Sequence, residues 1–208
     1  MLKLWGRASS SNVMKVLWLC EELGIPYERI DAGGEYGRTT EPFYLAMNPN
    51  SRVPTIEEDD GFTLWESNSI LRYLVASRAA GDPLHPAEPK ARAGVERWMD
   101  WQLGSVNGAM TPLFLGLVRT PEAKRDQSVL DRAREEAQAL WGILDRQLAG
   151  RDYVAGRFSL ADIALGPYVH RWFALPLERA PLANLEAWYG RLKANHAGFT
   201  SHVAVAMR

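Results

Sequence analysis

In the first third of the chain, short strand-like segments alternate with segments whose apolar residues recur at the spacing of a helix. "LKLW" (2–5) and "YERI" (27–30) have the composition of short strands. The segment between them carries an apolar stripe at helical spacing, formed by Val13, Val16, Leu17 and Cys20. Gly24 then ends the predicted helix. Strand, helix and strand in this order predict a β-α-β unit, whose right-handed crossover makes the two strands parallel.

The next segment predicts a hairpin followed by a helix. "VPTIEE" and "FTLW" are strand-like and flank the turn "DDG" at 59–61. "ESNSILRYLVASR" then repeats its apolar residues at helical spacing. Residues 31–52 lack a clear period, and a loop of this length is often functional. The first unit is therefore expected to be βαβ followed by ββα.

The stretch "AAGDPLHPAEP" (79–89) predicts a domain boundary, because its prolines interrupt helices and stiffen a linker. We expect a first domain over 1–79, a linker over 80–87 and a second domain over 88–208. Beyond the boundary the strand signals fade. Helical patterns follow at 88–117, 121–148, 160–173 and 182–193. The second domain is therefore expected to be all-helical.

Composition narrows the functional class. Lys and Arg number 24 against 25 Asp and Glu, so no charge excess points to nucleic acid or to an anionic membrane surface. The apolar runs are too short to cross a membrane, and the first residues do not resemble a signal peptide. The single cysteine, Cys20, excludes an internal disulfide and a Cys-x-x-Cys pair, and the histidines lack metal-ligand spacing. We expect a cytoplasmic protein without a metal site.

Three consecutive serines, 9–11, precede the first helix. A helix N-terminus leaves backbone N–H groups unpaired and favours an anion. A thiol bound there ionises more readily, and a hydroxyl that donates to the thiolate assists further. The alternative is plain helix capping by one of the hydroxyls. Both interpretations stay open on these residues alone.

Two further stretches suit a peptide-like ligand. In "NSRVPTI" (50–56), a cis Val53–Pro54 bond leaves the Val53 backbone groups free to pair with a ligand, whereas an ordinary trans proline is the alternative. In "LWESNSIL" (64–71), Glu66 suits an ammonium, and the free N–H groups at the helix start suit a carboxylate. The alternative is a cap by Ser67 or Ser69 beside a solvated glutamate.

Taken together, "SSSNVMKVLWLCEELGIPYE", "NPNSRVPTIEE" and "LWESNSILRYL" resemble the cytosolic glutathione transferase family, and "SLADIAL" resembles the capping box of its helical domain. The "S-x-N-V-x-K-V" frame is similar to the serine-type pattern of phi-like and related bacterial members. The resemblance implies an α/β thioredoxin-like N-terminal domain followed by an all-α C-terminal domain. It also implies a glutathione S-transferase that joins glutathione to small hydrophobic electrophiles, with no tightly bound cofactor, and a homodimer.

The resemblance assigns roles residue by residue. Ser10 would activate the thiol, with Ser11 and Ser9 as rivals because an offset of one residue changes the answer. The expected glutathione contacts are Asn12, Arg38, Arg52, Val53, Glu66 and Ser67. Apolar walls for the second substrate are expected from Trp5, Tyr36, Trp101 and Met110. The open alternatives are a noncatalytic binding protein of the same fold, and glutathione-dependent peroxide reduction or dehalogenation.

Overall fold

The computed structural model describes residues 1–207 and begins with a four-stranded sheet. The strands follow the order β2-β1-β3-β4, with β1 and β2 parallel and the other pairs antiparallel. Their bounds are β1 Leu2–Trp5, β2 Tyr27–Ile30, β3 Thr55–Glu57 and β4 Thr63–Trp65. In register, Leu4 faces Arg29 on β2 and Ile56 on β3. The expected β-α-β crossover and hairpin are thereby confirmed.

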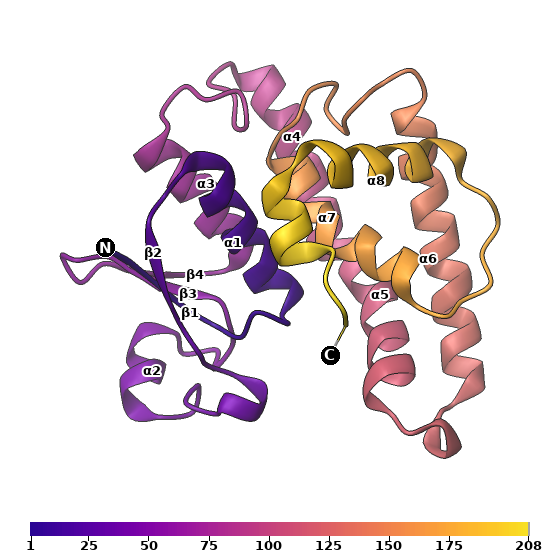
Figure 1. Ribbon diagram of the computed structural model, residues 1–208, viewed down its shortest axis with the longest axis horizontal. Coiled ribbons are helices and arrows are strands. Elements are labelled where there is room, and N and C mark those ends of the chain that lie inside the picture. The colour runs from indigo at the N-terminus through magenta and orange to yellow at the C-terminus, as the bar shows by residue number, and fades with distance from the viewer. Residues whose placement is uncertain (208) are drawn as a thin grey trace.

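Helices cover both faces of this sheet (Figure 1). Helices α1 and α3 lie on one side, and the short α2 lies on the other. Their bounds are α1 Ser11–Leu23, α2 Pro42–Met47 and α3 Ser67–Arg78. Helix α2 and a 3-10 turn at Gly34–Tyr36 occupy the segment expected to be an irregular loop. The thioredoxin-like N-terminal domain follows the predicted order of elements.

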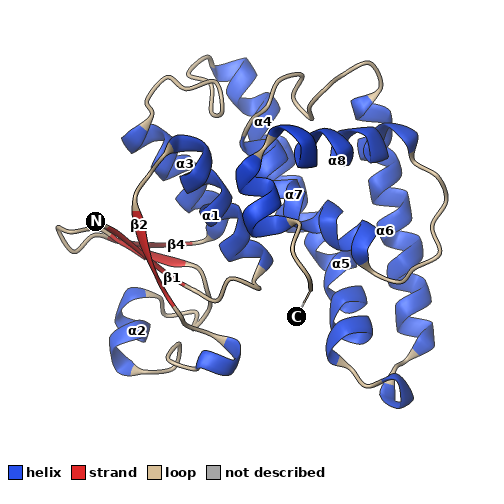
Figure 2. Cartoon of the chain, viewed as in Figure 1, coloured by secondary structure: helices blue, strands red, loops and turns tan. Residues whose placement is uncertain are grey.

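The rest of the chain is helical (Figure 2). Its α-helices are α4 Pro89–Trp101, α5 Asn107–Phe114, α6 Gln127–Leu148, α7 Leu160–Ala174 and α8 Ala183–Asn195. Three π-helical segments extend or follow them, at Gln102–Val106, Leu115–Arg119 and Phe199–Val203, and a 3-10 turn lies at Glu122–Lys124. The all-helical prediction is confirmed, although the π segments carry no sequence pattern that foretold them. No helix within residues 1–207 has the length and apolarity that a membrane crossing requires.

Helix α7 is the centre of the helical domain. It is buried from Leu160 to His170, as expected of a helix that packs on all sides against α1, α4, α5 and α8. Its start is the predicted capping box of Ser159 and Asp162. The Asp162 carboxylate also accepts hydrogen bonds from Trp188 Nε1 at 2.9 Å and from the Val154 N–H at 3.0 Å. This buried carboxylate therefore fixes the start of α7 against α8.

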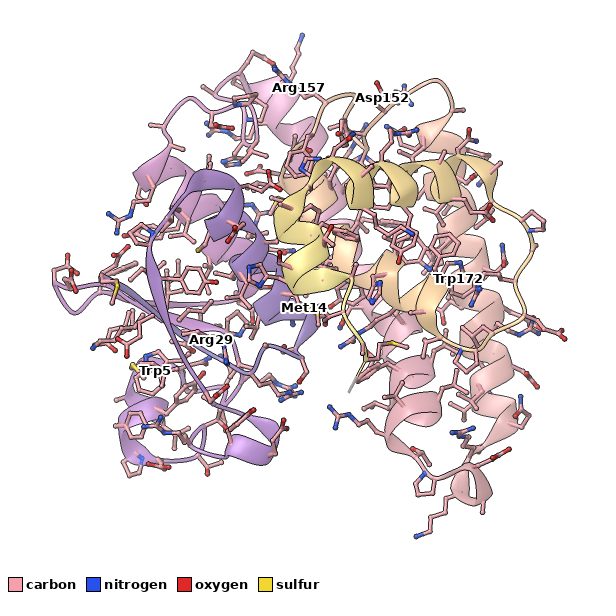
Figure 3. All side chains as sticks on the ribbon, in the orientation of Figure 1. Trp5, Met14, Arg29, Asp152, Arg157 and Trp172 are labelled. Carbon is pink, nitrogen blue, oxygen red and sulfur yellow. The ribbon has the colours of Figure 1, made fainter. Side chains whose placement is uncertain are left out.

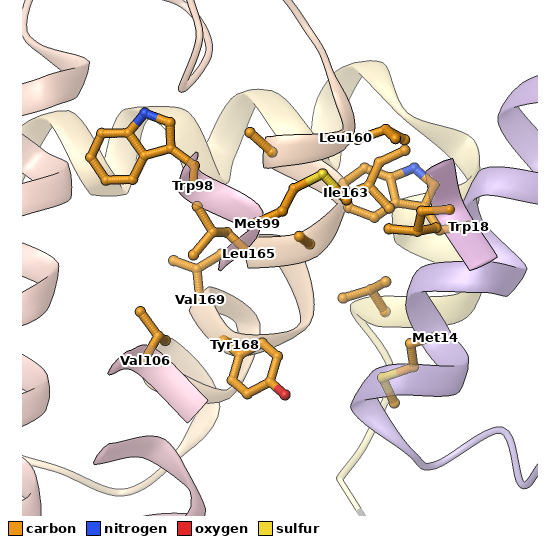
Figure 4. Packing of buried hydrophobic residues seen from close by; sticks show 14 of the residues in the cluster. Met14, Trp18, Trp98, Met99, Val106, Leu160, Ile163, Leu165, Tyr168 and Val169 are labelled. Carbon is orange, nitrogen blue, oxygen red and sulfur yellow. The ribbon is translucent and has the colours of Figure 1, made fainter. Parts of the chain in front are cut away.

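The two domains meet where α1 packs against α7. A Cβ added at Gly166 would lie 2.4 Å from Trp18 Cζ3, so only glycine allows this close approach. The Trp18 and Phe199 rings are 4.9 Å apart, centroid to centroid. Figure 4 shows Trp18 and Met14 on α1 beside the α7 side chains, among them Tyr168 with its polar tip. Helix α1 is thus held rigidly between the sheet and the helical domain.

Candidate functional site

The N-terminus of α1 presents an unused hydroxyl. Ser10 occupies the N-cap position, with its carbonyl accepting from the Met14 N–H at 2.9 Å, yet its side chain makes no capping hydrogen bond. The first turn of α1 contains no acidic residue. Its N–H groups and partial positive charge therefore have no anionic partner in that turn. The interpretation of Ser10 as a plain side-chain cap is wrong.

The three serines face different surroundings. Ser11 is buried, and its hydroxyl lies against that of Tyr168. Burial raises the Tyr168 pKa, and the contact with Ser11 works in the opposite direction. Ser9 lines hollows on the side of the C-terminal segment. Ser10 lies between them, half-buried, with a hydroxyl free to meet a ligand.

The approach to β3 presents free backbone groups. The Val53–Pro54 peptide bond is cis, so the trans alternative is wrong. The Arg52 carbonyl accepts from Tyr44 Oη at 2.7 Å and from Asn48 Nδ2 at 2.9 Å, which anchors the segment. Among residues 1–207, no hydrogen bond uses the Val53 backbone N–H or carbonyl. These groups can pair with an extended ligand.

The start of α3 adjoins the start of α1. Glu66, not a serine, occupies the N-cap position of α3, so the alternative of a cap by Ser67 or Ser69 is wrong. Glu66 has a φ of 70°, which is uncommon for a non-glycine residue and typical of ligand sites. Its side chain is exposed, whereas Ser67 is buried and donates from Oγ to Asn12 Oδ1 at 3.3 Å. This bond brings Asn12 and Ser67 together.

Behind this pair lies a buried ammonium that the sequence analysis missed. Lys15 is 0% exposed, and its Nζ donates to Gln102 Oε1 at 2.6 Å and to Ser67 Oγ and Asn68 Oδ1, each at 3.3 Å. Burial lowers the Lys15 pKa from 10.5 to about 7, and the charge of Glu66 partly opposes that shift. The available signal was a single lysine inside the otherwise apolar run "VMKVLW".

The network reaches the helical domain through Tyr168. Its hydroxyl donates to Asn107 Oδ1 at 2.9 Å and lies 3.3 Å from Asn12 Oδ1. The Lys15 ammonium lies 5.3 Å from the Tyr168 ring centroid. The side-chain oxygen of Asn12, Oδ1, accepts from Ser67 Oγ and lies near the Tyr168 hydroxyl. The side-chain amide nitrogen of Asn12 has no hydrogen-bond partner among residues 1–207. That nitrogen can donate to a ligand.

The remaining predicted contacts lie apart from this cluster. Arg38 is exposed and stacks over Trp5 and Phe43, with its Cζ at 5.1 and 5.6 Å from their ring centroids. The Arg52 side chain is exposed. Within the described part of the chain, no hydrogen bond or ion pair joins either guanidinium to Ser10.

A cavity of about 280 Å³ opens beside the loop between β1 and α1. It is lined by the loop residues 7–9, the end of β2, Tyr36 and the C-terminal segment 201–206. A smaller hollow shares Ser9, Val205 and Ala206 with it. Figure 3 labels Arg29 on the sheet side of this region and Met14 between the two domains. The cavity therefore lies next to the serines and can admit a small ligand.

Only one of the four expected wall residues lines this cavity, namely Tyr36. Met110 is 1% exposed in the helical core, so its selection as a wall is wrong. Trp5 is buried against Tyr44 on the α2 face of the sheet, and Trp101 packs against the Trp98 ring at 5.2 Å. Trp5 and Met110 are core and Trp101 packs against the core, as aromatic and Met side chains at helical spacing commonly do.

The chain is similar to known proteins over nearly its whole length. Residues 1–76 match the family model "Glutathione S-transferase, N-terminal domain", and residues 127–191 match "Glutathione S-transferase, C-terminal domain". "Glutathione S-transferase GstB" of Escherichia coli K12 is 42% identical over 194 residues, covering 92% of this chain and 93% of that protein.

Solved structures agree. The theta class glutathione S-transferase of Xanthomonas axonopodis pv. citri with glutathione bound has a TM-score of 0.94 and 42% identity. That match covers 100% of this chain and 99% of the other. The Bombyx mori glutathione transferase BmGSTD1 has a TM-score of 0.86 and 28% identity, with coverages of 98% and 93%.

Proposed function

The chain belongs to the glutathione S-transferase family, and from that premise we propose that it binds glutathione, holds its sulfur as a thiolate and conjugates it to small electrophiles. The observation that carries this proposal is the free Ser10 hydroxyl at an α1 N-terminus that has no acidic residue in its first turn. Glutathione is a co-substrate here and not a tightly bound cofactor.

The physical requirement is modest. Helix N-termini and hydrogen-bond donors lower a thiol pKa from about 8.5 into the range of about 3.5–7.5. Lowering the thiol pKa by one unit requires about 1.4 kcal/mol, and a hydrogen bond to a charged acceptor contributes about 1.5–3 kcal/mol. One Ser10 hydroxyl together with the helix end is therefore sufficient. Ser11 faces Tyr168 and Ser9 faces the C-terminal segment, which favours Ser10 over both rivals.

Glutathione would lie across the starts of α1, β3 and α3. The Val53 backbone groups suit its cysteinyl peptide unit, because they are free and follow an anchored Arg52 carbonyl. Glu66 suits the γ-glutamyl ammonium, and Ser67 with the first N–H groups of α3 suits the adjoining carboxylate. The Asn12 amide nitrogen donates toward the bound tripeptide. The exposed Arg38 and Arg52 are the cations available for the glycyl carboxylate.

The reaction is a nucleophilic substitution. The thiol proton leaves to solvent, and the thiolate attacks an electrophilic carbon seated in the cavity beside Ser9. A carbon–sulfur bond forms, and the carbon–halogen bond of an aryl halide breaks, with the halide leaving with the electron pair. The protein supplies a lowered thiol pKa and a fixed approach of the two reactants.

The test compares single serine variants in the conjugation of glutathione to 1-chloro-2,4-dinitrobenzene. Ser10→Ala is expected to lower kcat/KM about tenfold to a hundredfold, the size of one charge-assisted hydrogen bond. Ser9→Ala and Ser11→Ala are the matched controls and should retain most activity. A loss of activity seen only in Ser11→Ala would assign the activation of the thiol to Ser11 instead of Ser10. A protein that binds glutathione without conjugating this halide or reducing cumene hydroperoxide is a binding protein instead.

The proposal extends to assembly and location. Family membership supports a homodimer, which analytical ultracentrifugation tests directly. It also supports a cytoplasmic location, where glutathione and the single Cys20 stay reduced. The division into residues 1–79, 80–87 and 88–208 is part of the same proposal, and limited proteolysis within 80–87 tests it.

A further inference from the structure

We propose that the preferred electrophile carries an anionic group such as a carboxylate, which Arg7 and Arg171 receive at the end of the cavity nearest Ser9. This inference rests on the proposed function, because it concerns the second substrate of the same reaction. It departs from the expectation of a purely hydrophobic electrophile. The observation behind it is a pair of arginines that face the cavity region without any carboxylate partner.

Arg7 lies in the loop between β1 and α1 and lines the larger cavity. It is half-buried, and its guanidinium rests on the Gly33–Gly34 backbone, where a Cβ at Gly34 would lie 3.0 Å from Nη1. Its Nε is buried without a hydrogen-bond partner. Its side chain forms no hydrogen bond or ion pair within residues 1–207. Since a guanidinium always remains charged, these donors suit an incoming anion.

Arg171 approaches the same region from α7. Its Cζ lies 3.8 Å from the Phe114 ring centroid, and the residue lines the smaller hollow together with Ser9. It also has no hydrogen bond or ion pair to any other described residue. Burial lowers the Arg171 pKa to about 10; Tyr168 opposes the shift, and the positive charges of Arg7 and Arg119 add to it. The two positive charges therefore repel each other, and an anion bound near both relieves that repulsion.

The carboxylates nearby do not satisfy these cations. Asp31 lines the larger cavity but is ion-paired with Arg29. Glu35 is exposed at the edge of that cavity. The lining of the smaller hollow contains no Asp or Glu among the described residues. The positive charge at the Ser9 end is consequently left for a ligand.

The arrangement also fits the reaction geometry. Ser9 lines both hollows and directly precedes Ser10, the proposed partner of the thiolate. An electrophile whose reacting carbon meets the sulfur can therefore extend its far end toward Arg7. Bidentate pairing of a guanidinium with a carboxylate would then fix the orientation of the substrate. The cations act on binding and alignment, whereas Ser10 acts on the thiol.

The test uses a matched pair of electrophiles, 4-chloro-3,5-dinitrobenzoate and its methyl ester, which share the ring and the leaving group. At saturating glutathione, kcat/KM is measured for both in the wild type, Arg7→Met, Arg171→Met and Arg7→Lys. We expect each Met variant to lower kcat/KM for the benzoate about tenfold to a hundredfold and for the ester less than about threefold. Arg7→Lys should recover part of the loss. Arg179→Met, a half-buried arginine outside the cavity, is the control.

A binding measurement separates this inference from the proposed function. The two glutathione conjugates of these electrophiles are titrated calorimetrically, which requires no turnover. Tighter binding of the carboxylate conjugate, lost in Arg7→Met, supports the inference even if Ser10→Ala leaves activity intact. Equal affinity of the two conjugates in the wild type overturns the inference while leaving the transferase proposal standing. A rise in KM for glutathione in Arg7→Met, with equal loss for both electrophiles, overturns it as well, because Arg7 would then bind glutathione.

Discussion

Replacing Lys15 with Met tests whether burial behind the glutathione site lowers the pKa of this lysine. The Lys15 pKa falls from 10.5 to about 7 on folding, chiefly because burial removes the charge from water. Each pKa unit corresponds to about 1.4 kcal/mol, so the charged lysine costs on the order of 5 kcal/mol of folding stability. Glu66 at the start of α3 offsets part of the cost, and Tyr168 is the other titratable group that faces the ammonium.

The sign follows from proton binding. Between about pH 7 and 10.5 the unfolded chain keeps the Lys15 proton that the folded protein has lost, so the unfolding free energy rises with pH across this window. Below pH 7 both states are charged and the full cost is present. The unfolding free energy of the wild type minus that of Lys15→Met should therefore be constant below about pH 7. Above pH 7 this difference should rise by about 1.4 kcal/mol per pH unit.

The assay is urea unfolding of the wild type and the variant at a series of pH values from 6 to 9.5. Lys15→Gln is the matched control, because it also lacks the titrating group but retains a partner for the oxygens around it. The two variants should differ from each other by a constant offset and share the same pH-dependent difference from the wild type. A difference that stays flat from pH 7 to 9.5 would show that folded Lys15 keeps its proton in this range and would refute the lowered pKa.

Substitutions at two glycines and at Asp162, together with the reactivity of Cys20, test the packing. Gly166→Ala places a Cβ 2.4 Å from Trp18 Cζ3, so it should cost about 1–3 kcal/mol in urea unfolding, whereas Gly190→Ala, with open space around it, should be stabilising by up to about 1 kcal/mol. Asp162→Ala leaves buried donors without an acceptor and should cost about 3–5 kcal/mol, seen as a lower urea midpoint. Burial raises the Cys20 pKa to about 12, so the thiol should react with a disulfide reagent only after unfolding; rapid reaction of the native protein would contradict this.

The fold was largely predictable because its elements obey simple periods. The strands at 2–5 and 27–30 match their predicted bounds, and Ser159 with Asp162 forms the expected capping box. Such features depend on local spacing and turn residues. Helix α2 escaped prediction because its six residues, "PFYLAM", are too short to display a period. The π-helical segments continue neighbouring helices without any change of pattern.

The site was predictable only in part. Ser10, Asn12 and Ser67 were selected by resemblance, and the contact between Asn12 and Ser67 emerges only when α1 and α3 pack side by side. Met110 was misjudged because a helical stripe does not reveal whether it faces a core or a cavity. Neither Arg7 nor Arg171 was selected, because the two residues are distant in sequence and only the fold brings their charges within range of each other.

The most direct measurement is the titration of the glutathione thiol bound to the protein, followed by the ultraviolet absorbance of the thiolate. The account predicts that the bound thiol has a pKa below that of the free thiol, about 8.5, and that Ser10→Ala raises it by about one to two units while Ser9→Ala and Ser11→Ala leave it in place. A bound thiol that titrates like free glutathione, or a Ser10→Ala variant indistinguishable from the wild type, would contradict the central claim.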